Sequence, residues 1–535
     1  MSFDMADLPT DPEELRRFAL ACRTELAETR SRLKAATVAV QANRLEIEKL
    51  KVQLARLRRM KFGRSSERLD REIEQLELKL EELEIVGAEN AAVDAADPPS
   101  APSAARRKPR RLPLPEHLPR HEVVHQPAAG GDCRCPACGA GMARLGEDMT
   151  EVLDYVPGRF QVIRHVRPKY ACTACDAITQ AAAPALPIPR GQPSAGLLAR
   201  VLVAKYADHL PLYRQAGIYA RDGVDLDRST LADWVGQAAW LLAPLVEGIR
   251  RHVFAARKIH GDDTPVPVLA PGTDRTRTGR AWVYARDDRP HLGPAPPAAA
   301  FFYSPDRKAE RPREHLKGFA GFLQADAYAG FEPLYDPMRS APGRIVEVAC
   351  WAHCRRKYFD VWEATQSSIA KEALDRIAAL YAIEAAARFK PVADRLARRA
   401  AAKPLVDDFF AWADTVLRKL SAKSALAEAF RYTTGRGAAL TRFLDHGELE
   451  IDNNRAENCL RGIALGRRNW TFAGSDAGGH RAAAMYTLIE TAKLNDIDPE
   501  AYLRDVLDRI AKGHPINRIG QLLRWNQGSA PAKAA

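Results

Sequence analysis

The stretch KIHGDDTPV, residues 258–266, begins the segment that decides the fold. Its apolar and β-branched residues predict a strand that ends in two acidic residues, Asp262 and Asp263. Similar patterns predict two further strands, a helix and two more strands, over residues 280–284, 299–303, 310–318 (the helix), 321–326 and 344–350. The segment therefore predicts an α/β domain built on one sheet.

Three strands, a helix and two more strands is the element order of a ribonuclease-H-like sheet. In such a sheet the strands that end at Asp262 and Asp326 are neighbours, so we expect their carboxylates to lie close together. Residues 361–447 are Ala-rich and charged with no strand pattern, which predicts a helical insertion within a catalytic domain spanning 255–490. Helices and a tail are predicted over 491–535. The whole chain is thus predicted to be multidomain α+β.

A third carboxylate comes from ELEIDNNRAENCLR, residues 448–461. Glu457 is predicted to lie on a helix there, where Asn453, Asn454 and Arg461 share its face. Three carboxylates from separate segments suit two Mg²⁺ ions, which take oxygen ligands and leave positions open for water and phosphate. Alternatively, an Asp at a strand end forms a turn and a Glu in a charged helix is solvated. Two neighbouring residues compete for these roles, Asp263 with Asp262 and Asp452 with Glu457.

The N-terminal segment has coiled-coil patterning over residues 13–88, with Leu, Val and Ile recurring every seven residues. This pattern favours a homo-oligomer, with a helix that folds back on its own chain as the alternative. Residues 89–122 form a Pro- and Ala-rich linker. Its basic residues either neutralise DNA phosphates or are simply solvated, and they include Arg106, Arg107 and Lys108.

Two CxxC pairs lie within the predicted module 123–180. Four thiolates on two such turns complete a tetrahedral site that suits one structural Zn²⁺, and they are Cys135, Cys138, Cys172 and Cys175. A hairpin over 151–170, with a turn at Pro157-Gly158, accounts for the long spacing between the pairs. Basic residues on its second strand suggest that the module could face DNA. Residues 181–254 then predict helices, either a helix-turn-helix for DNA or a plain packing module.

The net charge of the chain gives a further indication of its binding partner. The chain of 535 residues has 80 Lys plus Arg against 68 Asp plus Glu, or 80 − 68 = +12. This excess favours a nucleic-acid partner, with a merely basic enzyme as the alternative. The 46% apolar content excludes a disordered chain. The sequence has no apparent secretory signal or long apolar run, so we expect no membrane contact, a cytoplasmic location on bacterial DNA, and metal-binding cysteines.

Together these motifs resemble a known family, the DDE transposases of the insertion sequence 66 family. The match runs over nearly the whole chain in order. It comprises the heptads with FGRSSE (62–67), both CxxC pairs, DDTPV (262–266), DAYAG (326–330), CWAH (350–353), DNN (452–454) with Glu457, and RRNW (467–470). The family usually has Asp-Glu-Thr-Pro-Val where this chain has Asp262-Asp263-Thr264, a departure that conserves charge.

The resemblance implies that Asp262, Asp326 and Glu457 hold catalytic Mg²⁺, for which Mn²⁺ could substitute. Water would cleave at a transposon end, and the freed 3′-hydroxyl would attack target DNA without a covalent protein intermediate. Cys350 and His353 match the family's Cys-x-x-His element, which either supports the active site or packs at a sheet edge. Asn454 is a further residue expected to support the active site.

Arg467, Arg468 and Trp470, with Arg461, would contact DNA by phosphate binding and stacking, or else be a packed Trp among solvated arginines. Accessory proteins of the same element are further expected partners. Two other functions stay open, a metal-dependent nuclease of the same fold without strand transfer and an inactive zinc-containing DNA-binding copy. The sequence does not specify the terminal repeat, the target or the number of subunits.

Overall fold

The computed structural model describes residues 114–125 (except 117), 138, 140–156, 158–189, 191–270, 275–339, 342–466, 469, 473–523 and 525, and isolated positions between 11 and 53. The predicted coiled coil and linker lie almost wholly outside these residues, as do Arg106, Arg107, Lys108, Cys135, Arg467, Arg468 and Trp470. None of the helices in the described ranges combines the length and apolarity needed to cross a bilayer.

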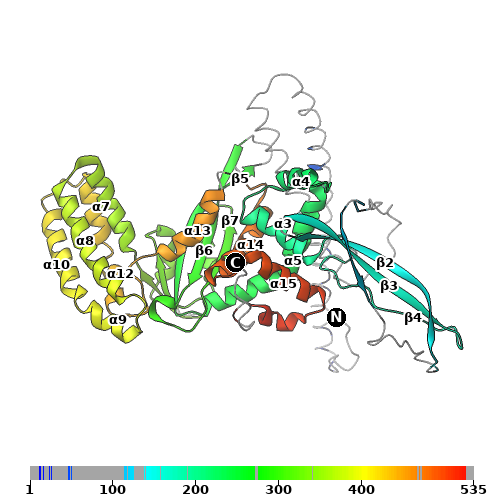
Figure 1. Ribbon diagram of the computed structural model, residues 1–535. Coiled ribbons are helices and arrows are strands. Elements are labelled where there is room, and N and C mark those ends of the chain that lie inside the picture. The colour runs from blue at the N-terminus through cyan, green and yellow to red at the C-terminus, as the bar shows by residue number, and fades with distance from the viewer. Residues whose placement is uncertain are drawn as a thin grey trace, which may run out of the picture.

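A mixed five-stranded sheet lies at the centre of the molecule (Figure 1). Its order is β7-β6-β5-β8-β9, with β5–β6 and β6–β7 antiparallel and β5–β8 and β8–β9 parallel. The strands are β5 (Lys258–Ala270), β6 (Arg275–Arg286), β7 (Ala298–Ser304), β8 (Gly321–Ala325) and β9 (Ile345–Val348), with helix α6 (Glu310–His315) between β7 and β8. The predicted element order is therefore confirmed.

The prediction that β5 ends at its acidic residues is wrong, because the strand continues to Ala270. Its parallel pairing with β8 stops at Gly261–Ala325, whereas its antiparallel pairing with β6 runs on to Ala270–Arg275. Asp262 therefore lies where β5 loses one neighbour and keeps the other. Pro265 and Pro267 lie in the part of β5 without the β8 partner, where a missing N–H is tolerated.

Helices cover the sheet and one of its edges. The helix α14 (Asp476–Leu494) lies along β7, where the Thr487 hydroxyl accepts a hydrogen bond from the Phe301 N–H (2.9 Å) and that of Thr491 from Ala299 (3.1 Å). These bonds cover backbone groups that an edge strand would otherwise expose. The remaining helices of this core are α3 (Ala195–Tyr206), α4 (Leu212–Arg221), α5 (Arg228–Phe254), α13 (Asn454–Gly466), α15 (Pro499–Ala511) and the 3₁₀ helix η5 (Ile516–Leu522).

The predicted helix-turn-helix region folds as α4 and α5, two helices joined by a turn. The 27-residue α5 buries Leu231, Trp234 and Val235 near its start and further residues along its length, in the same core as the sheet. That burial favours packing as the main role of α5. Reading of DNA by this pair of helices stays a prediction.

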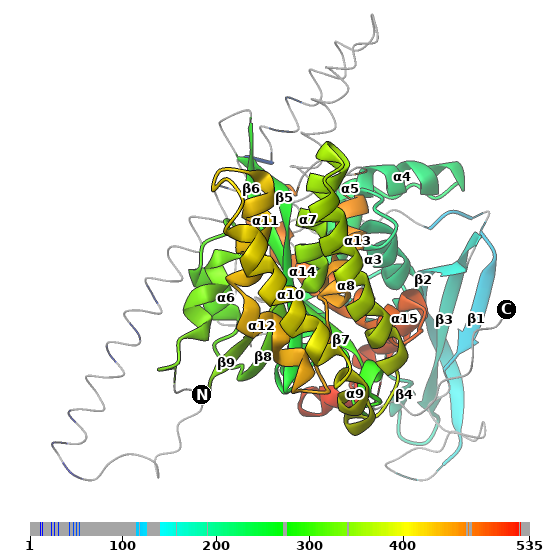
Figure 2. The same ribbon diagram turned by 90° about the vertical axis from the view of Figure 1, so that its left-hand side faces the viewer.

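The helices predicted as an insertion over 361–447 form a separate layer with its own apolar core, and this layer begins earlier than predicted, with a helix that starts at Trp351 (Figures 1 and 2). They stand to one side of the sheet, opposite the strands of the zinc module. Ser367 and Ser424 cap α8 and α11 through their hydroxyls. The helices are α7 (Trp351–Thr365), α8 (Ser368–Ala387), α9 (Val392–Arg399), α10 (Ala402–Leu417), α11 (Ala425–Thr434) and α12 (Gly437–Thr441).

A second sheet carries the cysteines. Its strands are β1 (Arg120–Val124), β2 (Met142–Val156), β3 (Arg159–Cys172) and β4 (Ile178–Gln180). β2 and β3 form the predicted antiparallel hairpin, and Gly158 takes a positive φ of 87° at its turn, a conformation that glycine adopts without strain. The long hairpin brings Cys172 back beside the start of β2, so the spacing between the CxxC pairs is indeed taken up by strands.

Candidate active site

Asp262 and Asp326 come from neighbouring parallel strands. Asp262 follows the last residue of β5 that pairs with β8, and Asp326 follows the last residue of β8. Burial and, after it, the negative charge of Asp326 raise the pKa of Asp262 to about 7, with smaller contributions from Asp263 and Glu457. The predicted proximity of Asp262 and Asp326 is thus reflected in the electrostatics of the site.

Asp263 points to the opposite face of β5 from Asp262, as adjacent strand residues do. Its side chain is 1% exposed and is bound by Arg307, whose Nε and Nη2 donate to Oδ1 at 3.0 and 2.8 Å, and by Arg280, 3.1 Å from Oδ2. Arg307 also lies over the Tyr328 ring at 4.0 Å and 3.9 Å from Asp326. With two cations around it, Asp263 is a structural carboxylate and a poor competitor for the metal role.

Glu457 approaches from the first turn of α13, a helix that packs against β5 and β6. One of its oxygens, Oε1, is buried without a hydrogen-bond partner and lies 3.8 Å from His353 Nε2. The other, Oε2, lies 3.7 Å from Arg356. Both neighbours belong to α7 and precede residue 361, the predicted start of the insertion, so the first helix of the helical layer contributes to the surroundings of this carboxylate.

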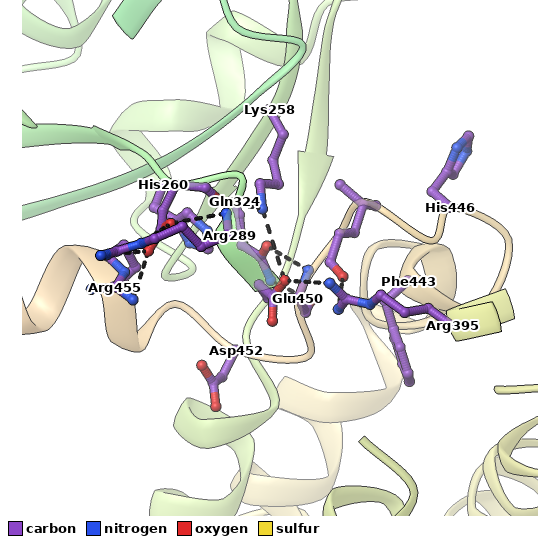
Figure 3. Close-up of polar contacts among 12 residues, drawn as sticks. Lys258, His260, Arg289, Gln324, Arg395, Phe443, His446, Glu450, Asp452 and Arg455 are labelled. Carbon is purple, nitrogen blue, oxygen red and sulfur yellow. Dashed lines mark hydrogen bonds and ion pairs between the residues drawn. The ribbon is translucent and has the colours of Figure 1, made fainter. Parts of the chain in front are cut away.

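Asp452, the competitor of Glu457, has local partners instead. It accepts hydrogen bonds from the backbone N–H (3.2 Å) and the side-chain Nδ2 (2.8 Å) of Asn454. In Figure 3 its carboxylate points away from the other residues drawn. Asn454 is occupied in this turn, which does not favour the supporting role predicted for it. Arg461 is exposed on α13, one turn beyond Glu457.

The two members of the Cys-x-x-His element have different surroundings. Cys350 is buried, accepts a hydrogen bond from the Asn453 N–H (3.2 Å), and burial raises its pKa to about 12, so it is a neutral thiol. His353 reaches Glu457 as described above. Within this element, Cys350 therefore packs in the protein interior, whereas His353 lies at the candidate site.

The three carboxylates are suited to divalent cations. Asp262 is held against two other acidic groups with a raised pKa, and Glu457 has an orphaned buried oxygen, so a bound cation would relieve both costs. Among the described residues, the oxygens of these three side chains are not all within 4.8 Å of one another, and the one group of three that meets this limit is made of cysteines.

That group is Cys138, Cys172 and Cys175. The Cys138 sulfur lies 3.6 Å from that of Cys172 and 3.7 Å from that of Cys175. Three sulfurs this close, on two separate turns, form a set of soft ligands of the kind that zinc prefers.

The basic side chains of the hairpin are largely paired with acidic ones. Arg164 contacts Glu151 (2.9 Å), and Lys169 and Arg167 contact Asp148 (2.7 and 3.8 Å). These pairs lower the charge that β3 would present to DNA and make the hairpin a weaker candidate for phosphate binding than its sequence suggested.

Two residues of the site were not anticipated from sequence. Arg307 comes from the loop between β7 and α6, where nothing distinguishes it from other surface arginines. Arg356 lies three residues after His353 on a helix, and that spacing was an available signal. Asn453 was predicted to share the face of Glu457, and the structure shows that it is fully buried.

The clustered cysteines and the mixed sheet with its acidic residues are typical of a multidomain protein with a zinc-type cysteine site, and comparison with known proteins specifies the family. The family model described as "Transposase IS66 family" matches residues 190–481, more than half of the chain. Three companion models match other parts of the chain: "zinc-finger binding domain of transposase IS66" (132–176), "Transposase C of IS166 homeodomain" (49–123) and "IS66 C-terminal element" (487–525).

Two relatives align with this chain over most of its length. The uncharacterized protein y4hP of Sinorhizobium fredii is 42% identical over 90% of this chain and 89% of its own length. The uncharacterized protein y4qI of the same organism is 38% identical over 98% of this chain and 99% of its own. The chain belongs to the IS66 family of transposases. Its zinc-finger and transposase domains make DNA its partner.

Proposed function

We propose that this chain binds the ends of a bacterial insertion sequence and catalyses metal-dependent DNA cleavage followed by strand transfer. The observation that supports the proposal is the electrostatics of Asp262, which lies where the neighbouring strands β5 and β8 of a sheet of order β7-β6-β5-β8-β9 stop pairing. Its pKa is raised by burial and then by the charges of acidic groups that include Asp326 and Glu457. We infer that this sheet is ribonuclease-H-like, since three antiparallel-linked strands are followed by two parallel ones.

Two Mg²⁺ ions, or Mn²⁺ in their place, would be held by Asp262, Asp326 and Glu457. Bound there, they would supply activation of the attacking oxygen and stabilisation of the leaving one. The chain's own residues fix the ligands. Arg307 holds Asp263 on the far face of β5, and the Tyr328 N–H donates to Asp326 Oδ1 (3.2 Å), which orients that carboxylate.

On the α7 side of the site, the guanidinium of Arg356 adds a positive charge next to Glu457. His353 and Arg356 both lie within 3.8 Å of its oxygens, and Arg356 is 61% exposed. An exposed guanidinium at this point is available to bind a DNA phosphate near the reacting bond.

The other modules support end binding. The three clustered cysteines and the matched zinc-finger model support one structural Zn²⁺, with Cys135 as the fourth ligand. Arg106, Arg107, Lys108, Arg461, Arg467, Arg468 and Trp470 are proposed DNA contacts. The heptads over 13–88 would join copies of the chain so that two ends are processed together, with accessory proteins of the element as further partners, on DNA in the bacterial cytoplasm.

The test is cleavage of DNA that carries the element's ends, with Mg²⁺, by the wild type and by Glu457→Gln. We expect the wild type to release 3′-hydroxyl ends and join them to target DNA, and the variant to bind ends but not cleave. Cleavage without joining would assign a nuclease, and end binding without any cleavage by the wild type would assign an inactive DNA-binding copy. Cleavage retained by Glu457→Gln would reject the triad.

A further inference from the structure

The chain returns from the insertion to the active site through one short buried segment, residues 449–453. Its start is held by the insertion, because the side chains of Arg395 and Arg399 donate to the Leu449 carbonyl at 2.9 and 2.8 Å. Its middle is held by β8, where Gln324 exchanges two hydrogen bonds with the backbone of Glu450. Its end, Asn453, is followed directly by α13.

Buried ion pairs also connect residues 449–453 to the insertion and to the sheet (Figure 3). The Glu450 carboxylate accepts a hydrogen bond from Arg395 Nη1 (2.9 Å) and lies 3.9 Å from the ammonium of Lys258 at the start of β5. Arg395 is 1% exposed and Lys258 is 2% exposed, so these charges interact with little screening by water. The segment is thus anchored to both β5 and β8, the strands that lead to Asp262 and Asp326.

Asn453 makes the last of these connections and is wholly buried. Its Nδ2 donates to the carbonyl oxygen of Gly261 at 2.8 Å, directly before Asp262 and at the point where β5 and β8 stop pairing. Its Oδ1 lies 3.2 Å from His260 Nδ1. Its backbone N–H donates to the sulfur of Cys350, which precedes α7 and His353.

The same residue also begins the helix that carries the third carboxylate. The Asn453 carbonyl accepts hydrogen bonds from the N–H groups of Ala456 (3.1 Å) and Glu457 (3.4 Å). A second anchor lies one residue into the helix, where Arg455 contacts Asp287 (2.6 Å) after β6. The first turn of α13 is therefore fixed in both position and rotation, which sets where the Glu457 side chain can reach.

We propose that Asn453 is a positioning residue, which fixes Glu457 relative to Asp262 by hydrogen-bonding β5, the start of α7 and the start of α13 at one point. Asn453 acts through Glu457 and touches no reacting atom. The proposal rests on the proposed function, because it assigns this geometry to the binding of a divalent cation by the carboxylates. Loss of a residue that orients metal ligands typically lowers metal affinity by about 10- to 100-fold.

The experiment compares full-length Asn453→Ala and Asn453→Leu with a matched control, Thr487→Val. Thr487 is equally buried and its hydroxyl also bonds the backbone of a strand, Phe301, but on β7, an edge strand of the sheet, whereas Asn453 bonds the central strand β5. Asn453→Leu keeps the branching of the side chain and leaves no cavity, at a somewhat larger volume, so its comparison with Asn453→Ala separates the loss of hydrogen bonds from cavity formation. Urea unfolding of all three measures the stability that each bond contributes.

The decisive readout is Mn²⁺ binding, measured by titration of the free-ion signal in electron paramagnetic resonance. We expect both Asn453 variants to bind Mn²⁺ about 10- to 100-fold more weakly than the wild type, and Thr487→Val to bind it normally at a similar loss of stability. In cleavage, the Mg²⁺ concentration for half-maximal rate should rise for the Asn453 variants and excess Mg²⁺ should restore part of the rate.

The positioning role would be overturned if the Asn453 variants fold and bind Mn²⁺ with wild-type affinity. It would also be overturned if both Asn453 variants fail to fold while Thr487→Val folds. Failure of the proposed function gives a different result, since the wild type itself would then neither bind Mn²⁺ at the carboxylates nor cleave end-bearing DNA. Asp262→Asn serves as the reference for loss of that site.

Discussion

Asp262→Asn should stabilise the protein at neutral pH when divalent metal is absent. Burial and the neighbouring Asp326 raise the pKa of Asp262 to about 7 in the folded state, from an ordinary 3.8. A carboxyl group whose pKa is raised by folding contributes its full stability below pH 3.8, and this contribution is lost as the pH rises to 7. Above pH 7 the folded protein therefore contains an unfavourable buried charge, which the neutral Asn removes.

The magnitude follows from the shift. About three pKa units at 1.36 kcal/mol each set a ceiling of about 4 kcal/mol, and partial solvation reduces the expected gain to about 1–3 kcal/mol. The difference between variant and wild type should vanish near pH 3.5, reach about two fifths of its full size at pH 5 and be complete by pH 8. The Asp263 N–H, which donates to Asp262 Oδ1 at 2.8 Å, keeps an acceptor in the Asn side chain.

Calorimetric unfolding of both proteins in chelator at pH 5, 6.5 and 8 provides the assay, with Mg²⁺ added in a parallel series. Mg²⁺ should stabilise the wild type at pH 8 and leave the variant nearly unchanged. Asp287→Asn is the control of opposite sign. Burial raises the pKa of Asp287, but Arg289 and Arg455 outweigh burial and leave it below its ordinary value, so its stabilisation is present above pH 3.8 and lost as the pH falls. A gain in Asp262→Asn that is independent of pH and of Mg²⁺ would refute the reasoning.

Three further outcomes test other parts of the molecule. Arg395→Ala should cost about 3–5 kcal/mol in urea unfolding, because it leaves Glu450 buried with only Lys258 nearby, whereas Ala at the exposed Arg398 of the same helix should cost little. Metal analysis should find one zinc per chain, and Cys172→Ala should lose the zinc and end binding without abolishing Mn²⁺ binding at the carboxylates; a variant that keeps its zinc would exclude Cys172 as a ligand. Arg307→Lys should keep the charge but lose the two-pronged contact with Asp263 and slow cleavage by about 10-fold or more, and an unchanged rate would show that Arg307 does not position the site.

Local patterns in the sequence were sufficient for much of the architecture. The strands from β5 to β9, the zinc hairpin and the helical insertion follow from alternation, helical periodicity and turn residues, which act over a few neighbours. The extension of β5 beyond Asp263 was missed because it depends on β6, whose pairing with residues 262–270 is a tertiary contact. Two prolines in that stretch also weakened the strand signal.

The chemistry of the site could be predicted only in outline. Asp262, Asp326 and Glu457 were identifiable because acidic residues at predicted strand ends and on a helix match a known order. The partners that tune them, Arg307 and Asn453, come from segments 44 and 192 residues away from their partners in the chain. No periodicity connects residues at such separations, so these contacts were found only from the structure.

The adjacent pair Asp262 and Asp263 illustrates why a site of this kind needs the whole sheet. The two side chains differ by one position on β5 and therefore lie on opposite faces. Arg307 and Arg280 compensate the charge of Asp263, although this charge still raises the pKa of Asp262, after burial and the charge of Asp326. If both carboxylates lacked cations, β5 would contain two adjacent uncompensated charges, at a larger cost in folding stability. The arginines on one face thus allow the other face to keep a carboxylate uncompensated until metal and DNA bind.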